Sequence, residues 1–102
     1  MLPKENDVAV VVGATGHVGR YVANGLARAG WHVRAVARRR EPTRPGVEAC
    51  PADVCDPDAF NAVLQGAYGI FLSLPVMLQT PDLARIGRDI TQAGISTTVL
   101  LS

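Results

Sequence analysis

A glycine-rich turn between an apolar strand and a helix constrains this 102-residue chain more than any other feature. Residues Val8–Val12 are all apolar and mostly β-branched, as in a strand buried on both faces of a parallel sheet. Three glycines spaced three apart follow directly, Gly13, Gly16 and Gly19, and a helical pattern of apolar residues then continues to a stop at Gly30. This order predicts a backbone cradle for the pyrophosphate of a dinucleotide, because the glycines allow a tight turn and close approach and the helix N-terminus attracts anions.

Apolar runs alternate with helical segments along the rest of the chain. Helix-start signals at Asp56-Pro57 and Thr80-Pro81 predict two further helices, which end before Gly66 and Gly94. Further strands are predicted at residues 32–37, 47–50, 67–74 and 97–101. The expected fold class is therefore α/β, a doubly wound parallel sheet of the Rossmann type with about five strands in the order 3-2-1-4-5, truncated after the fifth. No repeat or linker divides the chain, so residues 1–102 are expected to form one domain.

The composition argues against two classes of partner. A net charge of +1 gives no general attraction to nucleic acid or to an anionic membrane, and apolar stretches such as residues 69–78 are too short to span a bilayer. Cys50 and Cys55 match no zinc-site spacing, so we expect two unpaired thiols and no metal. With no signal sequence in evidence, these features predict a cytoplasmic protein that binds neither nucleic acid nor membrane.

The glycine turn supplies the first set of candidate binding groups. Backbone N–H groups near Thr15, Gly16, His17 and Val18 are placed to meet the phosphates. The His17 side chain has no evident hydrogen-bond partner for acid–base chemistry, so it is interpreted as a solvent-facing residue at the start of the helix.

The residues at the end of the second strand are expected to set the preference between NAD(H) and NADP(H). An acidic residue there would bind the ribose 2′-hydroxyl and repel a 2′-phosphate, but Ala37 occupies the place and Arg38 follows. Arginine offers planar, multidentate donors to phosphate. We therefore expect NADP(H) to be preferred, with Arg38 as the main contact and Arg39 beside it. The alternative is a solvated basic loop, the role expected for Arg40 and Arg44.

With these features in register, the chain resembles the N-terminal part of an atypical short-chain dehydrogenase of the NmrA-like, or NAD(P)H-binding, type. Four segments carry the resemblance: Gly13-Ala14-Thr15-Gly16-His17-Val18-Gly19, Val33–Arg38, Ala52–Pro57 and Leu72–Pro75. The resemblance implies that Asp53, with Val54, approaches the adenine, the carboxylate accepting from the exocyclic amine. It also implies that Leu74 and Pro75 line the nicotinamide-ribose side of the cleft. The alternative role for Asp53 is to cap the next helix, for which Asp56 is better placed.

These residues lack the catalytic pair that many members of the family carry. Many members carry a Tyr-x-x-x-Lys pair, whereas here Gly25 lies four residues after Tyr21, Leu72 lies four after Tyr68, and Lys4 is the only lysine. No catalytic residue is therefore assigned. Family members also continue into a substrate-binding part that these residues do not include.

Three functions remain open at this point. The first is an oxidoreductase that passes a hydride from NADPH to a small organic acceptor such as a quinone or carbonyl compound. The second is a non-catalytic, NADP(H)-sensing regulatory module, and the third is an inactive truncated fragment. The apolar last strand, Val99–Leu101, is expected at an uncovered sheet edge, which predicts self-association or low stability.

Overall fold

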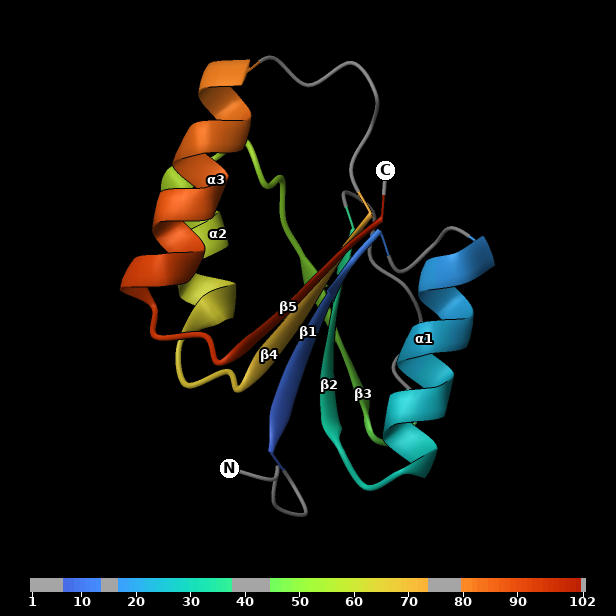
Figure 1. Cartoon of the computed structure of the whole chain (residues 1–102). Helices are drawn as coiled ribbons and strands as arrows, with labels where there is room; N and C mark the ends of the chain where they lie inside the picture. The colour runs from blue at the N-terminus through green and yellow to red at the C-terminus, as the bar shows by residue number, and fades with distance from the viewer. Residues whose placement is uncertain (1–6, 14–16, 38–44, 74–79, 102) are drawn as a thin grey trace.

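The computed structural model describes residues 7–13, 17–37, 45–73 and 80–101. Within them, five parallel strands form one sheet in the order β3-β2-β1-β4-β5 (Figure 1). The strands are β1 (Val8–Val12), β2 (His32–Ala37), β3 (Val47–Pro51), β4 (Gly69–Ser73) and β5 (Thr97–Leu101). The predicted fold class and strand order are confirmed.

Among the described residues, three helices cover the two faces of this sheet. They are α1 (His17–Arg28), α2 (Pro57–Leu64) and α3 (Thr80–Gln92). Helix α1 lies on one face and α2 and α3 on the other (Figure 1). This division follows from right-handed crossovers, because the chain moves across the sheet in one direction from β1 to β2 and in the opposite direction from β3 to β4 and β5.

The predicted helix signals act as expected at α2. The Asp56 side chain caps this helix by accepting hydrogen bonds from the amides of Asp58, at 3.1 Å, and Ala59, at 3.4 Å, and Pro57 is the first helical residue. Beyond its last residue, Leu64, the backbone becomes extended.

Two strand boundaries differ from the prediction. The fourth strand begins at Gly69 rather than Ala67, because the Ala67 amide still bonds the Leu64 carbonyl at 3.1 Å in the turn after α2. The third strand extends one residue further, to Pro51, which pairs with Ala37. Leu74, the predicted last residue of the fourth strand, lies outside the described residues.

Strand β1 is buried on both faces, as its unbroken apolar sequence predicts. Val10 and Val12 pack into a cluster on the α2/α3 side, while Val11 packs into a second cluster on the α1 side. Successive side chains of a strand point to opposite faces, so one valine run serves two cores. Each buried valine contributes about 1.5–3 kcal/mol, which holds the carboxyl end of β1 at the centre of the molecule.

Candidate functional site

Gly13 joins the ends of three strands. Its amide donates to the Val36 carbonyl of β2 at 3.0 Å, and its φ is +82°. A Cβ at this position would lie 3.0 Å from the backbone oxygen of Ser73, the last residue of β4. The ends of β1 and β4 therefore meet so closely that only glycine fits without strain. These two strands flank the point where the sheet order reverses, which is where doubly wound sheets bind ligands.

Helix α1 begins four residues beyond Gly13. His17 is its first residue, Val18 is 49% exposed, and Gly19 is buried. The first turn contains no acidic residue, so no side-chain charge of this turn opposes an anion at the helix N-terminus. Thr15 and Gly16 were also predicted to contact phosphate, and they lie outside the described residues.

The carboxyl end of β2 lacks an acidic side chain at its last position. Ala37 ends the strand and is half-buried, and its carbonyl accepts from the Ala52 amide at 3.0 Å. Arg38 and Arg39, predicted to contact the 2′-phosphate, lie outside the described residues, as do Leu74 and Pro75.

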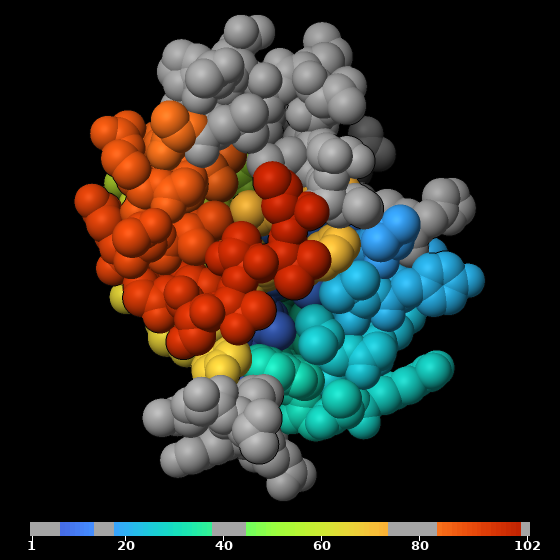
Figure 2. Space-filling view, in the orientation of Figure 1, coloured from blue at the N-terminus to red at the C-terminus, as the bar shows by residue number. Residues whose placement is uncertain are grey.

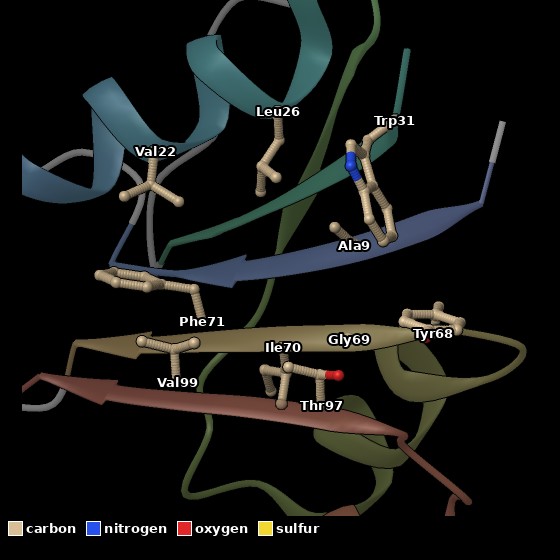
Figure 3. Close-up of a pocket in the computed structure, with 10 residues that line it drawn as sticks. All are labelled: Ala9, Val22, Leu26, Trp31, Tyr68, Gly69, Ile70, Phe71, Thr97 and Val99. Carbon is tan, nitrogen blue, oxygen red and sulfur yellow. The ribbon is translucent and has the colours of Figure 1, made fainter. Parts of the chain in front are cut away.

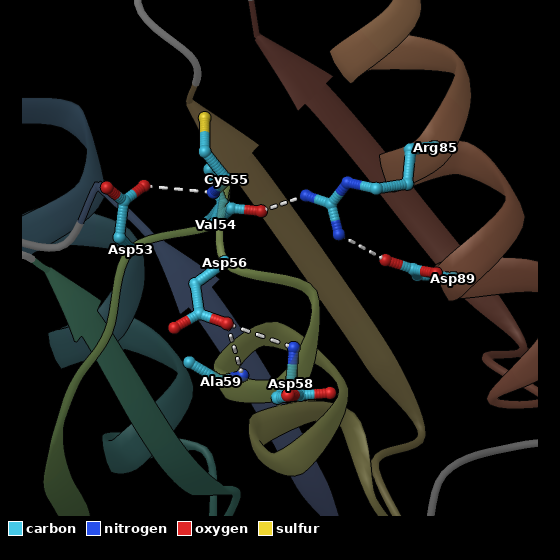
Figure 4. A network of polar contacts seen from close by, with 8 residues as sticks. All are labelled: Asp53, Val54, Cys55, Asp56, Asp58, Ala59, Arg85 and Asp89. Carbon is cyan, nitrogen blue, oxygen red and sulfur yellow. Dashed lines mark hydrogen bonds and ion pairs between the residues drawn. The ribbon is translucent and has the colours of Figure 1, made fainter.

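Asp53 lies in the loop between β3 and α2, with an exposed side chain. Its Oδ1 accepts from the Cys55 amide at 2.9 Å, and its carbonyl accepts from the Asp56 amide at 2.9 Å (Figure 4). The alternative role of helix cap is excluded for Asp53, because Asp56 caps α2. The loop thus holds an exposed carboxylate in a fixed bend.

An arginine that the sequence analysis did not single out contacts this loop. The Arg85 guanidinium, on α3, donates to the Val54 carbonyl and to Asp89 Oδ2, the latter at 2.7 Å (Figure 4). Its Cζ lies 6.0 Å from the centroid of the buried Phe60 ring. The i, i+4 spacing of Arg85 and Asp89 is a recognisable signal for an ion pair on a helix, but nothing in the sequence relates Arg85 to a residue 31 positions away.

Cys50 and Cys55 are not joined in a disulfide. Cys55 is exposed, and Cys50 is half-buried on β3. Burial raises the pKa of the Cys50 thiol, and the Glu48 carboxylate raises it further, while the Arg34 guanidinium acts in the opposite direction. Over residues 7–13, 17–37, 45–73 and 80–101 no group of three or more His, Cys, Asp or Glu side chains is placed to hold a metal ion.

The α1 face of the sheet carries an apolar groove of about 310 Å³ (Figure 3). Val22 and Leu26 point into it from α1, and the aromatic rings of Trp31 and Tyr68 lie at one end, 5.6 Å apart. Its remaining wall comes from β1, β4 and β5, through Ala9, Gly69, Ile70, Phe71, Thr97 and Val99.

Strand β5 borders this groove at the edge of the sheet, as predicted, and two of its apolar side chains are exposed. Val99 is 51% and Leu100 63% exposed, and β5 lies at the surface between α3 and α1 (Figure 2). In the part of the chain that the structure describes, no helix has the length and apolar character to cross a membrane.

This chain is similar in sequence to a reductase and similar in fold to two proteins of known structure. The chain is 28% identical over 99 residues to cinnamoyl-CoA reductase 1 of Oryza sativa subsp. japonica, an alignment that covers 86% of this chain and 29% of that enzyme. A variant of uronate dehydrogenase from Agrobacterium tumefaciens, solved with NAD, is 25% identical with a TM-score of 0.73, over 94% of this chain and 40% of that one. NmrA, a negative transcriptional regulator solved with NADP, has a TM-score of 0.83 at 18% identity, over 95% of this chain and 33% of that one.

The chain covers a small part of these relatives but nearly all of its own length matches one family. This chain spans less than a third of the length of the curated relatives that it matches. The model of the NmrA-like family matches residues 5–99, which include the glycine turn, the Asp53 loop and all five strands except the end of β5. This match over nearly the whole sequence shows that the chain belongs to the NmrA-like family.

Proposed function

We propose that residues 1–102 form the NADP(H)-binding part of an oxidoreductase that passes a hydride to a small organic acceptor of the quinone or carbonyl type. The observation that carries this proposal is the close meeting of Gly13 with Ser73 at the carboxyl ends of β1 and β4. It sets a glycine turn, followed by a helix N-terminus free of acidic residues, at the switch point of a doubly wound sheet.

In this proposal Gly13, Gly16 and Gly19 let the backbone come close to the diphosphate, and amides at Thr15, Gly16, His17 and Val18 hold it. Asp53 and Val54 hold the adenine, and Leu74 and Pro75 line the nicotinamide-ribose side. When bound, the nicotinamide of NADPH supplies the hydride, so the task of these residues is to bind and orient the cofactor.

The reductase function is supported by relatives rather than by a catalytic group in this chain. Cinnamoyl-CoA reductase 1 and uronate dehydrogenase are oxidoreductases by name, and the latter was solved with NAD. NADP(H) is proposed over NAD(H) because Ala37 ends β2 without an acidic side chain and Arg38 follows it.

Thermal unfolding with added nucleotide tests binding and preference together. NADPH at 100 times its dissociation constant should raise the free energy of unfolding by about 2.7 kcal/mol, and NADH at the same concentration should raise it less. Arg38→Asp should weaken NADPH binding by about tenfold or more, because a charge-assisted bond to phosphate is lost, and leave NADH binding nearly unchanged.

The matched control is Arg88→Asp on α3, which makes the same charge change at an exposed position outside the proposed site. It should leave both affinities unaltered. If neither nucleotide shifts the unfolding curve at millimolar concentration, the proposal is wrong.

A second candidate is a non-catalytic sensor whose NADP(H) occupancy controls association with another protein. The observation that favours it is the structural likeness to NmrA, a negative transcriptional regulator solved with NADP. NADPH oxidation with a panel of quinones separates the two functions. Steady turnover supports the enzyme, and tight binding without turnover supports the sensor.

We also propose that the chain pairs with a second copy of itself along β5. The outer edge of this strand has no neighbour in the described sheet, and Val99 and Leu100 are exposed on its two faces. Pairing along that edge would bring side chains of the second copy beside Val99 on one face and Leu100 on the other. We further propose a reducing, cytoplasmic setting for the protein, in keeping with two cysteines that are not joined in a disulfide.

A further inference from the structure

We propose that Arg85 is a positioning residue for adenine recognition: it fixes the Val54 carbonyl and so holds the loop that presents Asp53. This inference rests on the proposed function, because it assigns Asp53 to the adenine. Arg85 itself lies on α3 and is not proposed to touch the nucleotide.

The loop is fastened at three successive points. The Ala52 amide bonds the Ala37 carbonyl at 3.0 Å, which ties the loop to the end of β2. Asp56 caps α2 and ties the other end to that helix. Between them, the bond from Arg85 to the Val54 carbonyl is the contact that reaches across to α3.

Asp53 and Arg85 lie on opposite sides of this loop (Figure 4). The Val54 carbonyl points toward Arg85, while Asp53, on the far side of the loop, accepts from the Cys55 amide through Oδ1. The Val54 carbonyl, bonded by Arg85, and the Cys55 amide, bonded by Asp53 Oδ1, belong to the same peptide group. Rotation of that peptide would therefore turn the Asp53 side chain as well.

The surroundings of Arg85 suit a fixed anchor rather than a surface charge. Asp89 is only 8% exposed and receives one arm of the guanidinium at 2.7 Å, while the other arm reaches Val54. The buried Phe60 ring lies on a third side. A planar guanidinium can donate to two acceptors in fixed directions, which a lysine ammonium on a flexible stem does less well.

The test compares two nucleotides that differ at position 6 of the base, where Asp53 would accept from the amine, and at the neighbouring N1, which is an acceptor in adenine and an N–H donor in hypoxanthine. NADPH carries a 6-amino donor on its base, and the reduced nicotinamide hypoxanthine dinucleotide phosphate carries a 6-oxo group there. Dissociation constants are measured by calorimetry on the 102-residue chain, at a temperature where every variant is folded. The wild type should prefer NADPH by about tenfold, the expected value of a hydrogen bond to a charged group.

Arg85→Met should reduce this preference to about twofold, by weakening NADPH while the hypoxanthine nucleotide keeps its affinity. The matched control, Arg88→Met on the exposed side of the same helix, should keep the tenfold preference. If Arg85→Met lowers both affinities equally, Arg85 supports the fold alone and the inference is overturned.

If Arg85→Met does not fold, Arg85→Lys is measured in its place. It retains a cation beside Asp89 and Phe60 but should still lose most of the preference for NADPH, and an undiminished preference would overturn the inference. Hydrogen exchange of backbone amides gives a measurement that needs no nucleotide. In the Arg85 variants, the Cys55 amide should exchange faster than in the wild type, relative to the amides of α1.

The wild type separates this inference from the proposed function. If it binds both nucleotides with equal affinity, the adenine role of Asp53 and the positioning role of Arg85 fail while cofactor binding stands. If it binds neither, the proposed function itself fails.

Discussion

At the scale of single residues, Gly13 leaves little room for a side chain. Its φ of +82° lies in the left-handed region, and the space beside its Cα is taken by the Ser73 backbone. Gly25 differs, because it is exposed in the middle of α1 and a Cβ there would meet nothing within 4 Å.

We expect opposite effects on stability from the same substitution at these two positions. Gly13→Ala should lower the free energy of unfolding by about 2 kcal/mol, since left-handed backbone costs an L-residue about 1–2 kcal/mol and the new methyl group crowds Ser73. Gly25→Ala should raise it by about 0.5–1 kcal/mol through higher helix propensity. Urea denaturation followed by circular dichroism measures both. Equal effects at the two sites would contradict the assignment of Gly13 to a constrained turn.

Residue-scale roles were predictable where the signal is local. Asp56 was identified as a helix cap because the cap, Pro57 and the helix are adjacent in sequence. The contact of Arg85 with the Val54 carbonyl could not be predicted, because it depends on where α3 lies relative to the loop after β3. The predicted roles of Asp53 and Arg38 stay predictions.

At the scale of elements, Arg34 links β2 to the end of α2. Its Nη1 donates to the carbonyls of Val63, at 2.8 Å, and Gln65, at 2.7 Å. The last carbonyls of a helix have no partner within the helix, and a cation near them is also favoured by the helix dipole. One strand residue thus fixes where α2 ends against the sheet.

Arg34→Met should lower the free energy of unfolding by about 1–3 kcal/mol, the range for losing a charged donor to partly buried carbonyls. Arg88→Met, at an exposed position on α3, should change it by less than about 0.5 kcal/mol. The comparison is made by urea denaturation of the two variants and the wild type. A similar small loss in both variants would mean that the Arg34 contacts add little to stability.

At the scale of the whole molecule, the two faces of the sheet differ in cover. Helices α2 and α3 lie over one face, whereas on the α1 face the apolar groove beside β5 is open (Figures 1 and 2). An apolar strand at an open sheet edge offers both backbone hydrogen bonds and apolar area to another chain. This is the physical basis for the proposed pairing along β5.

Val99→Lys should weaken self-association by at least about tenfold, because lysines from two copies would be brought together at the paired edge. The control Gln92→Lys adds the same charge on the exposed surface of α3 and should not alter association. Sedimentation velocity over a range of concentrations measures the effect. A wild-type chain that stays monomeric at high concentration would contradict the pairing.

The sequence by itself determined the class of fold, the order of the strands and the places where helices begin and end. The strands and helix ends follow from local chemistry, namely apolar β-branched runs, glycines at fixed spacing and side-chain caps. The order of the strands follows from the right-handed crossovers of a doubly wound sheet. Tertiary structure alone decided that Gly13 packs against Ser73, that Arg34 ends α2, and that Arg85 holds Val54. Each of these contacts joins residues far apart in the chain. Their distances depend on how the sheet and the helices pack as a whole, which no short segment of sequence encodes.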